Sequence, residues 1–445
     1  MSFSAATLRT VLEAHVPETA AGIVVAVSGG PDSAALLAAT AELRPLKRNL
    51  PLRAIHVDHG LQAAAGSFRI ACTALCRRLD IPLTIIATAV AAGAGASIEA
   101  AAREARYAAL EAALRAGECL LTAHHRDDQA ATFLLQGLRG AGLKGLSAMP
   151  MCAVFGTGWH LRPVLGVPQK ELLALQADSA GAASLDPMNQ DVRFDRVYLR
   201  AQVWPLIEAR WPGAARALSR AARHAADAQG FLDVRSAADV ARLRDGESLS
   251  VHGLRAMSAS ARLHAARYWL RESGVEPPST ARLTEALRQM LDAEADHLPA
   301  VIWGSHALRR YRHRLFVTAA ELPRLPDVLR WTGLAQPLEL GPGLGTVRWA
   351  VHAGGIDPGR LPDTLEVRRR VGGEALKPMP SAKTQSLRHL CQSIGVLPWL
   401  RGALPLIFAH EQLIAVADLW TNADCRVAAP VSGLNLVWQD APIIV

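Results

Sequence analysis

A buried strand that runs into a glycine-rich turn and then into a helix constrains this chain more than any other feature. The apolar run 22–27 leads into a turn formed by Ser28, Gly29, Gly30, Pro31, Asp32 and Ser33. The next residues, 34–44, carry apolar side chains at helical spacing. Glycines let a backbone approach an anion closely, proline fits the first helical turn, and N–H groups at a helix N-terminus bind phosphate. The turn therefore predicts a phosphate-binding loop, with an ordinary strand–helix turn as the alternative.

Short apolar runs alternate with helical stretches up to Pro205. The further runs that we expect to be strands are 52–59, 82–90, 119–125 and 159–165. Such alternation is typical of βα units, which pair their strands in parallel and cover the sheet with helices. We therefore predict an α/β fold with a doubly wound, Rossmann-like parallel sheet, whose ligands bind at the carboxyl ends of the strands.

The composition changes after Pro205, which indicates further domains in a chain of 445 residues. Alanine and arginine recur at helical spacing, proline and glycine then become frequent, and short apolar runs surround one helical stretch near the end. We expect four segments: a catalytic domain at 1–212, a helical domain at 213–320, a linker at 321–360 and a small α+β domain at 361–445.

The net charge of +8 favours an anionic partner. Most of the excess lies in residues 206–325, which hold 18 Lys and Arg against 13 Asp and Glu. A nucleic-acid-binding surface and an ordinary solvated helical surface both explain this distribution.

The six cysteines include no Cys-x-x-Cys pair, which favours reduced, buried thiols over a zinc or iron–sulfur site. No stretch is apolar for long enough to span a membrane, and Arg9 and Glu13 stand where a signal peptide would need an apolar run. We therefore expect a soluble, cytoplasmic protein with no membrane partner.

Two titratable side chains close the second expected strand. His56 and Asp58 end the run 52–59, and strand alternation puts both on one side of the sheet. Because this edge collects ligands, we expect them to face the same site as the glycine turn. A purely structural role at the strand end is the alternative.

A second polar group lies where the run 119–125 passes into a helix. His124 and Asp128 are four residues apart and can share a helix face, while Asp127 and Asp128 gain from the helix dipole. An acidic helix cap is the alternative, and a zinc site is disfavoured because the usual ligand spacing is missing.

Arg103 and Arg106 stand one turn apart in the helical stretch 97–110. On one helix face they can neutralise phosphate or hold a carboxylate. An exposed pair on a solvated face explains the spacing equally well.

Several motifs carry a family resemblance. The glycine turn resembles the pyrophosphate-binding loop of the N-type ATP pyrophosphatases, the PP-loop family, which split ATP into AMP and pyrophosphate by adenylating a substrate oxygen. The P-loop of kinases is excluded because no Gly-Lys-Ser/Thr follows. Within that family, the tRNA(Ile)-lysidine synthetases are the branch that the chain resembles, in HVDHGLQ, SIEAAAREARYAAL, TAHHRDDQ and the segments 186–212 and 365–420.

This resemblance implies an ATP-dependent ligase that forms a carbon–nitrogen bond. The enzyme would attach free L-lysine to the first anticodon cytidine of a tRNA(Ile) with a CAU anticodon, through an adenylated cytidine, and would release AMP and pyrophosphate. The residues that would bind ATP are Ser28, Gly29, Gly30, Pro31, Asp32, Ser33, His56 and Asp58.

The same resemblance assigns expected roles to the other candidates. Asp128, helped by Asp127 and His124, would be catalytic. Mg²⁺ would bind through Asp32 or Asp128. The groups that would hold phosphate or the lysine carboxylate are those of Arg103 and Arg106.

Contacts with tRNA are expected from the helical and C-terminal domains and from Lys144, Arg193, Arg196, Arg200, Arg368 and Arg369. The chain departs from the family pattern at Ala131, where the family has glutamate, and at Val197, where it has asparagine. These departures keep two alternatives open: another tRNA-modifying enzyme of the PP-loop family, and a tRNA-binding paralogue with weakened catalysis. A homodimer is one of the oligomeric states that the sequence leaves open.

Overall fold

The computed structural model describes residues 4–44, 49–58, 65–88, 98–174, 192–294 and 297–442, without the side chains of 65 and 98–100. The chain divides into two compact units, Met1–Leu232 and Asp233–Val445, and each is described by itself. Within the described ranges, no helix combines the length and the apolar character needed to cross a membrane.

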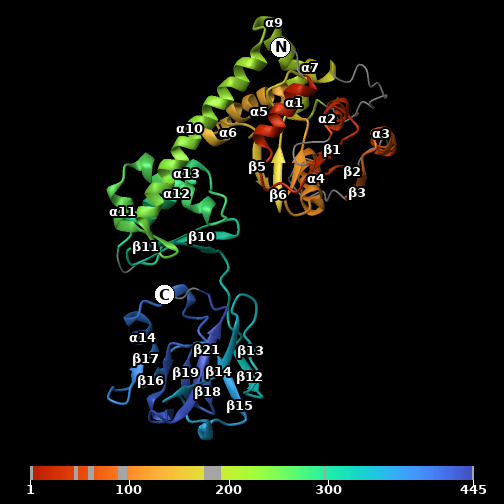
Figure 1. The fold of residues 1–445 in the computed structure, drawn as a ribbon. Coiled ribbons are helices and arrows are strands. Elements are labelled where there is room, and N and C mark those ends of the chain that lie inside the picture. Colours follow the sequence, from red (N-terminus) through yellow and green to blue (C-terminus); the bar gives the residue numbers. More distant parts are fainter. Residues whose placement is uncertain are drawn as a thin grey trace. The chain divides into compact units, whose positions relative to one another are not determined.

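A six-stranded sheet forms the centre of the first unit (Figure 1). Its strands, in the order in which they pair, are β3 (Leu83–Ala87), β2 (Leu52–Asp58), β1 (Gly22–Ala26), β4 (Glu118–Leu121), β6 (Gly158–Leu161) and β5 (Cys152–Phe155). The first five are parallel, as the sequence predicts. The edge strand β5 was not expected; it pairs antiparallel with β6 through a tight turn in which Gly156 has a φ of 53°.

Helices cover both faces of this sheet, which confirms the doubly wound fold. Alternate residues of β1 point to opposite faces. Ile23 and Val25 join a core with Leu8 and Leu36, whereas Val24 joins a separate core with Leu110. The helices of this unit are α1 (Ala5–His15), α2 (Pro31–Glu42), α3 (Ala65–Arg78), α4 (Ile98–Ala113), α5 (Arg126–Leu138), α6 (Leu143–Leu146), α7 (Gln169–Ala174), α8 (Asp195–Tyr198) and α9 (Trp204–Arg210).

The strand order reverses direction at β1, whose two parallel neighbours are β2 and β4. The chain runs from β1 to β2 and β3 on one side and then returns to β4 on the other side. Such a switch in strand order leaves room for a ligand at the carboxyl ends of the strands. A π-helical turn, Leu199–Val203, links α8 to α9. The long helix α10 (Ala214–Leu243) crosses from the first unit into the second.

The expected helical domain also contains an antiparallel sheet. Its strands, in pairing order, are β7 (Arg244–Asp245), β8 (Ser248–Ser250), β11 (Arg314–Ala319), β10 (His306–Tyr311) and β9 (Ala300–Trp303). The core against this sheet includes Trp269 and Met290. Besides α10, the described residues of this part form the helices α11 (Val251–Ala256), α12 (Ala259–Glu272) and α13 (Thr280–Asp292).

The expected linker at 321–360 is wrong, because its residues form strands of the terminal sheets. β12 (Val328–Thr332) pairs with β15 (Thr364–Arg368), and β14 (Thr346–Ala353) pairs with β21 (Ser432–Gln439). Trp331 from this segment is buried and stacks on Trp349 at 5.5 Å between ring centroids.

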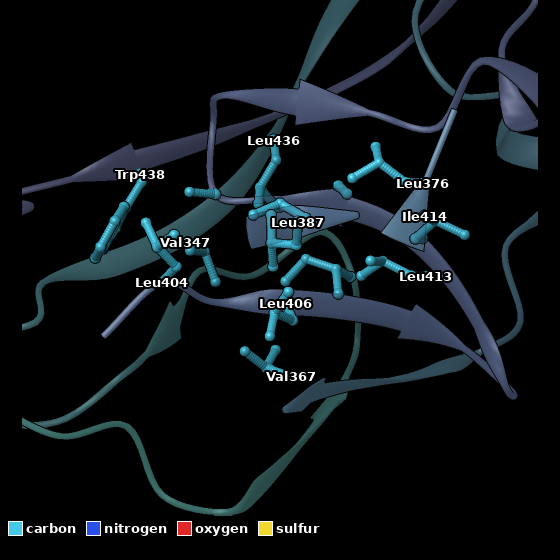
Figure 2. Packing of buried hydrophobic residues seen from close by; sticks show 14 of the residues in the cluster. Val347, Val367, Leu376, Leu387, Leu404, Leu406, Leu413, Ile414, Leu436 and Trp438 are labelled. Atoms are coloured by element: carbon cyan, nitrogen blue, oxygen red, sulfur yellow. The ribbon is translucent and has the colours of Figure 1, made fainter. Parts of the chain in front are cut away.

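The other elements at this end are β13 (Leu338–Glu339), β16 (Ala375–Leu376), β17 (Gln385–Ser386), α14 (Leu387–Ser393), β18 (Leu406–Ala409), β19 (Gln412–Val416) and β20 (Trp420–Thr421). Figure 2 shows their shared core, in which Val347 from the expected linker lies among Val367, Leu406 and Trp438. Removing these apolar side chains from water is the reason that the segment folds with the terminal domain.

Candidate active site

The glycine turn joins β1 to α2, and Gly29 is the residue that its shape requires. Gly29 has a φ of 88°, and a Cβ there would lie 2.7 Å from the Phe68 ring. Gly30 is the N-cap of α2 and brings no side chain to occupy the first N–H groups of the helix. Pro31 opens the helix. The loop therefore presents backbone N–H groups at a helix N-terminus, as phosphate binding needs.

Two serines brace this loop from within. The Ser33 hydroxyl donates to the carbonyl oxygen of Gly30 at 3.0 Å and accepts from the backbone N–H of Ser28 at 3.1 Å. The Ser28 hydroxyl accepts from the backbone N–H of Gly30 at 3.3 Å. Ser33 is buried, so its first role is to hold the loop rather than to reach a ligand.

A cavity of about 230 Å³ opens beside the loop, at the carboxyl ends of β1, β2 and β4. It brings together candidates that lie far apart in the sequence. The polar residues that line it are Ser28, Asp32, Ser33, His56, Asp58, Arg106, Tyr107, Thr122 and His124. His56 and Asp58 therefore line the same cavity as the glycine turn, and their role in binding a ligand stays a prediction.

His56 is held in one orientation. Its Nδ1 lies 2.8 Å from the carbonyl oxygen of Val27 and 3.5 Å from Cys72 Sγ. A carbonyl oxygen only accepts, so Nδ1 carries the hydrogen. Burial raises the pKa of Cys72 to about 12, which keeps this thiol neutral.

His125, the N-cap of α5, is surrounded by three carboxylates. Its Nδ1 lies 3.3 Å from Asp127 Oδ2, and its Nε2 lies 3.3 Å from Asp128 Oδ2 and 3.9 Å from Asp32 Oδ2. Burial alone would lower the pKa of His125, but the Asp127 side chain and the charges of Asp128 and Asp32 raise it above its ordinary value. The three carboxylates therefore favour the charged form of the ring, which lies between Asp32 of the loop and the start of α5.

Asp128 is kept ionised by its neighbours. Arg196 Nη2 lies 2.6 Å from its Oδ1, and the backbone N–H of His125 donates to its Oδ2 at 3.2 Å. Burial would raise the pKa of Asp128, but His125 and Arg196 lower it to about 2. The expected tRNA contact Arg196 thus lies inside the cluster, against the expected catalytic carboxylate.

Gln169, at the start of α7, connects Asp127 to Asp32. Its backbone N–H donates to Asp127 Oδ2 at 2.9 Å, and its Nε2 lies 3.1 Å from both carboxylate oxygens of Asp32. Burial raises the pKa of Asp32 above its ordinary value in spite of the nearby His125 charge. Gln169 and His125 were not among the expected site residues; the only sequence signal was the doubled histidine at 124–125.

A chain of hydrogen bonds leads from the buried Arg162 to Thr122 and His124, which line the cavity. Arg162 Nη2 lies 3.1 Å from His160 Nδ1, and His160 Nε2 lies 2.8 Å from the Thr122 hydroxyl. That hydroxyl lies 2.8 Å from His124 Nδ1. Burial lowers the pKa values of His124 and His160 to about 3, so both rings are neutral at pH 7. Sequence reasoning missed Thr122, His160 and Arg162.

Most of the chain is similar in sequence to known proteins. The sequence matches the PP-loop domain over residues 4–207, the TilS substrate binding domain over 249–316 and the TilS substrate C-terminal domain over 365–438. The tRNA(Ile)-lysidine synthase of Alkalilimnicola ehrlichii is 38% identical over 90% of this chain and 90% of its own. That of Xanthomonas axonopodis pv. citri is 38% identical over 96% of both chains, and that of Shigella flexneri is 36% identical over 95% and 97%.

The chain belongs to the tRNA(Ile)-lysidine synthase family. Its departures from the family pattern lie close to the cluster around His125. Ala131 is buried in α5, one turn after Asp128, and Val197 follows Arg196 on α8. Asp128 therefore has Arg196 and His125 as cationic partners, while residue 131 contributes no charge.

The two arginines of α4, Arg103 and Arg106, line different cavities. Arg106 lines the cavity beside the glycine loop, and burial lowers its pKa. Arg103 is exposed and lines a second cavity of about 390 Å³ with Arg139, Arg193 and Arg196. Both guanidinium groups pack on the Tyr107 ring, at 4.9 Å for Arg103 and 5.6 Å for Arg106. Of the two, Arg106 is the one placed to meet a ligand in the first cavity.

The expected tRNA-binding residues fall into two groups. Lys144 is exposed on α6, and Arg200 is exposed on the π-helical turn, where its charge acts on Asp32. In the second unit, Arg368 pairs with Glu366 at 2.8 Å and Arg369 pairs with Asp327 at 2.7 Å. These two arginines would have to exchange a carboxylate for a phosphate in order to bind tRNA.

The carboxylates suit a magnesium ion that arrives with a nucleotide. Within the described ranges, no group of three or more His, Cys, Asp or Glu side chains is arranged to hold a metal ion. Mg²⁺ usually binds through one or two carboxylates together with waters and substrate phosphates. Asp32 and Asp128 provide such oxygens on the same side of the His125 ring.

Proposed function

We propose that this protein attaches free L-lysine to the first anticodon cytidine of the AUA-decoding tRNA(Ile), which has a CAU anticodon. The reaction would consume ATP, pass through an adenylated cytidine, and yield lysidine, AMP and pyrophosphate. The observation that carries the proposal is the convergence of the Gly29 loop, Arg106, Asp32 and His124 on one cavity. Family membership supports the choice of tRNA and amino acid.

The first step would be adenylation of the carbonyl oxygen of the cytosine base. That oxygen attacks the α-phosphate of ATP, an O–P bond forms, and pyrophosphate leaves. The N–H groups at the start of α2 would hold the phosphates, and Arg106 would neutralise part of their charge. Mg²⁺ bound through Asp32 or Asp128 would supply further charge neutralisation at the phosphates.

The second step would be attack of the lysine amine on the ring carbon that carries the adenylated oxygen. A C–N bond forms, the bond from that carbon to the phosphorylated oxygen breaks, and AMP leaves. The amine must first lose a proton. The raised pKa of Asp32 suits proton acceptance, whereas Asp128, with a pKa of about 2, is a weak base that would attract the ammonium group.

Incubation with ATP, isotopically labelled lysine and tRNA tests the proposal. We expect label only in the first anticodon nucleotide of tRNA(Ile) with a CAU anticodon, and only when ATP is present. A methionine tRNA with the same anticodon is the control and should stay unlabelled. Binding of tRNA and ATP without any incorporation would overturn the ligase and favour the tRNA-binding paralogue.

Two further properties belong to this proposal. The protein would work in the cytoplasm, where it meets tRNA, ATP and free lysine. A homodimer stays a prediction, which light scattering of the full chain would test.

A further inference from the structure

Four side chains form a continuous hydrogen-bonded row that ends in the cavity. Arg162 and His160 come from the end of β6, Thr122 follows β4, and His124 lines the cavity beside the glycine loop. The three atom pairs lie 3.1, 2.8 and 2.8 Å apart. His160 is 3% exposed and Thr122 and Arg162 are each 8% exposed, so water is largely kept from the row.

Hydrogen-bond chemistry gives this row a single direction. The Arg162 guanidinium can only donate, so His160 Nδ1 accepts and the hydrogen of the neutral His160 ring lies on Nε2. His160 Nε2–H then donates to the Thr122 oxygen. A hydroxyl has one hydrogen, and that of Thr122 is left to donate to His124 Nδ1.

The hydrogen of the neutral His124 ring must therefore lie on Nε2. Burial lowers the pKa values of both histidines to about 3, and the charge of Arg162 acts in the same direction. His124 Nε2 has no hydrogen-bond partner among the described residues, and the residue lines the cavity with Ser28 and Asp32. A ring in this state has only a donor to offer and cannot accept a proton at Nε2.

We propose that Arg162, His160 and Thr122 act as positioning residues that fix His124 as a neutral Nε2–H donor to an oxygen of the nucleotide in the cavity. The inference rests on the proposed function only in taking a nucleotide as the ligand. The acceptor is either a phosphate oxygen of ATP or the carbonyl oxygen of the target pyrimidine. His124 then stabilises negative charge at that oxygen as it develops, and it does not act as a general base.

Nuclear magnetic resonance of the full chain with ¹⁵N-labelled histidine tests the direction of the row. His124→Gln assigns the His124 signal. We expect a hydrogen on Nε2 and none on Nδ1 at pH 7. A hydrogen on His124 Nδ1, or a charged His124 ring, would overturn the proposal whether or not the protein attaches lysine to tRNA.

Added ligands distinguish the two acceptors. A shift of the His124 Nε2–H signal with a non-hydrolysable ATP analogue alone identifies a phosphate oxygen. A shift that needs tRNA as well identifies the pyrimidine oxygen. No shift with both ligands bound would show that His124 donates to neither.

Thr122 provides a matched pair of variants. Thr122→Val keeps the shape of the side chain but removes the hydroxyl, whereas Thr122→Ser keeps the hydroxyl. We expect Thr122→Val to mix the two His124 tautomers and to lower kcat roughly 10- to 100-fold with little change in KM for ATP, and Thr122→Ser to restore most of the rate. Unchanged tautomer and kcat in Thr122→Val would refute the positioning role.

His160 gives a second pair, which keeps the test decisive if Thr122→Val does not fold. His160→Gln retains an N–H donor near the Nε2 position, and His160→Leu removes it. We expect only His160→Leu to release the His124 tautomer. The same His124 spectrum in both His160 variants would contradict the row.

Discussion

The Nη2 atom of Arg196 lies 2.6 Å from Oδ1 of Asp128, so an arginine from α8 holds the charge of a carboxylate near the start of α5. The two residues are 68 positions apart in the sequence. Their pairing connects the segment after the parallel sheet to the cluster around His125. It also keeps Asp128 ionised in a buried position.

Replacing Arg196 tests this pairing. Arg196→Met leaves a buried carboxylate with one cation fewer, so we expect the pKa of Asp128 to rise and the free energy of unfolding to fall by about 1–3 kcal/mol. Lysine incorporation should fall at least 10-fold. Denaturant unfolding and the lysine assay measure the two effects. Arg139→Gln is the stability control, because its pair with Asp195 is exposed; equal unfolding losses in both variants would refute a special role for Arg196.

Adding a methyl group at Gly29 tests the glycine loop. Gly29→Ala forces a residue with a Cβ into a φ of 88° and into contact with Phe68. We therefore expect the free energy of unfolding to fall by about 1–3 kcal/mol. We also expect the variant to lose binding of the ATP analogue. Calorimetry measures both. Gly66→Ala, where a Cβ meets no atom within 4 Å, should change neither. Full ATP-analogue affinity in Gly29→Ala would place the phosphates elsewhere.

Asp32 should separate chemistry from tRNA binding. Asp32→Ala removes the carboxylate that lines the cavity and accepts from Gln169, so we expect pyrophosphate release to be abolished while tRNA affinity stays within about 2-fold. Pyrophosphate detection and filter binding give the two readouts. Retained turnover would mean that the phosphate site has been assigned to the wrong carboxylate.

His160 should make the first unit sensitive to acid. Its pKa is lowered to about 3 in the fold, from an ordinary value of about 6.5. The unfolded chain therefore binds a proton first, so the stabilisation is complete above pH 6.5 and is lost as the pH falls toward 3. The free energy of unfolding should fall less steeply between pH 7 and pH 4 in His160→Gln than in the wild type. Exposed His297→Gln should keep the wild-type slope; equal slopes in all three proteins would contradict a buried neutral His160.

Helix α10 should contribute to tRNA binding by charge alone. Arg216, Arg220 and Arg223 are exposed on it at helical spacing, and none forms an ion pair with another residue of the described ranges. Changing all three to glutamine should lower the slope of log affinity against log salt by up to about 3, because each phosphate contact contributes about 0.9. Arg242→Gln is the control, since Arg242 already pairs with Asp239. An unchanged slope in the triple variant would remove α10 from the tRNA-binding surface.

The parallel sheet was predictable because its signals are local. Each βα unit carries its own apolar run and helical period, so 22–27 and 52–59 could be recognised without knowing their partners. The edge strand β5 and the strands β12 to β14 were not recognised. Their short apolar runs become strands only by pairing with distant segments, as Trp331 pairs with Leu365. The frequent proline and glycine residues around β12 to β14 also suggested a linker.

The site residues, too, divide into those with a local sequence signal and those placed by contacts between distant segments. His56 and Asp58 lie at the end of a strand, His124 follows a strand, and Asp32 and Asp128 are in the first turn of a helix. Their place at the sheet edge could therefore be inferred from their order along the chain. Gln169 reaches Asp32 across 137 positions, and His160 reaches Thr122 across 38. No local pattern indicates such contacts.

By itself, the sequence determined the shape of the glycine loop between β1 and α2, because glycine, proline and a helix start fix the local backbone whatever surrounds them. Only the tertiary structure decided what two adjacent histidines do. His124 is kept neutral by burial beside Thr122 and Arg162, while Asp127, Asp128 and Asp32 raise the pKa of His125 and favour its charged form. The protonation state of a histidine depends on its burial and on the charges near it in space, and neither can be inferred from its neighbours in the sequence.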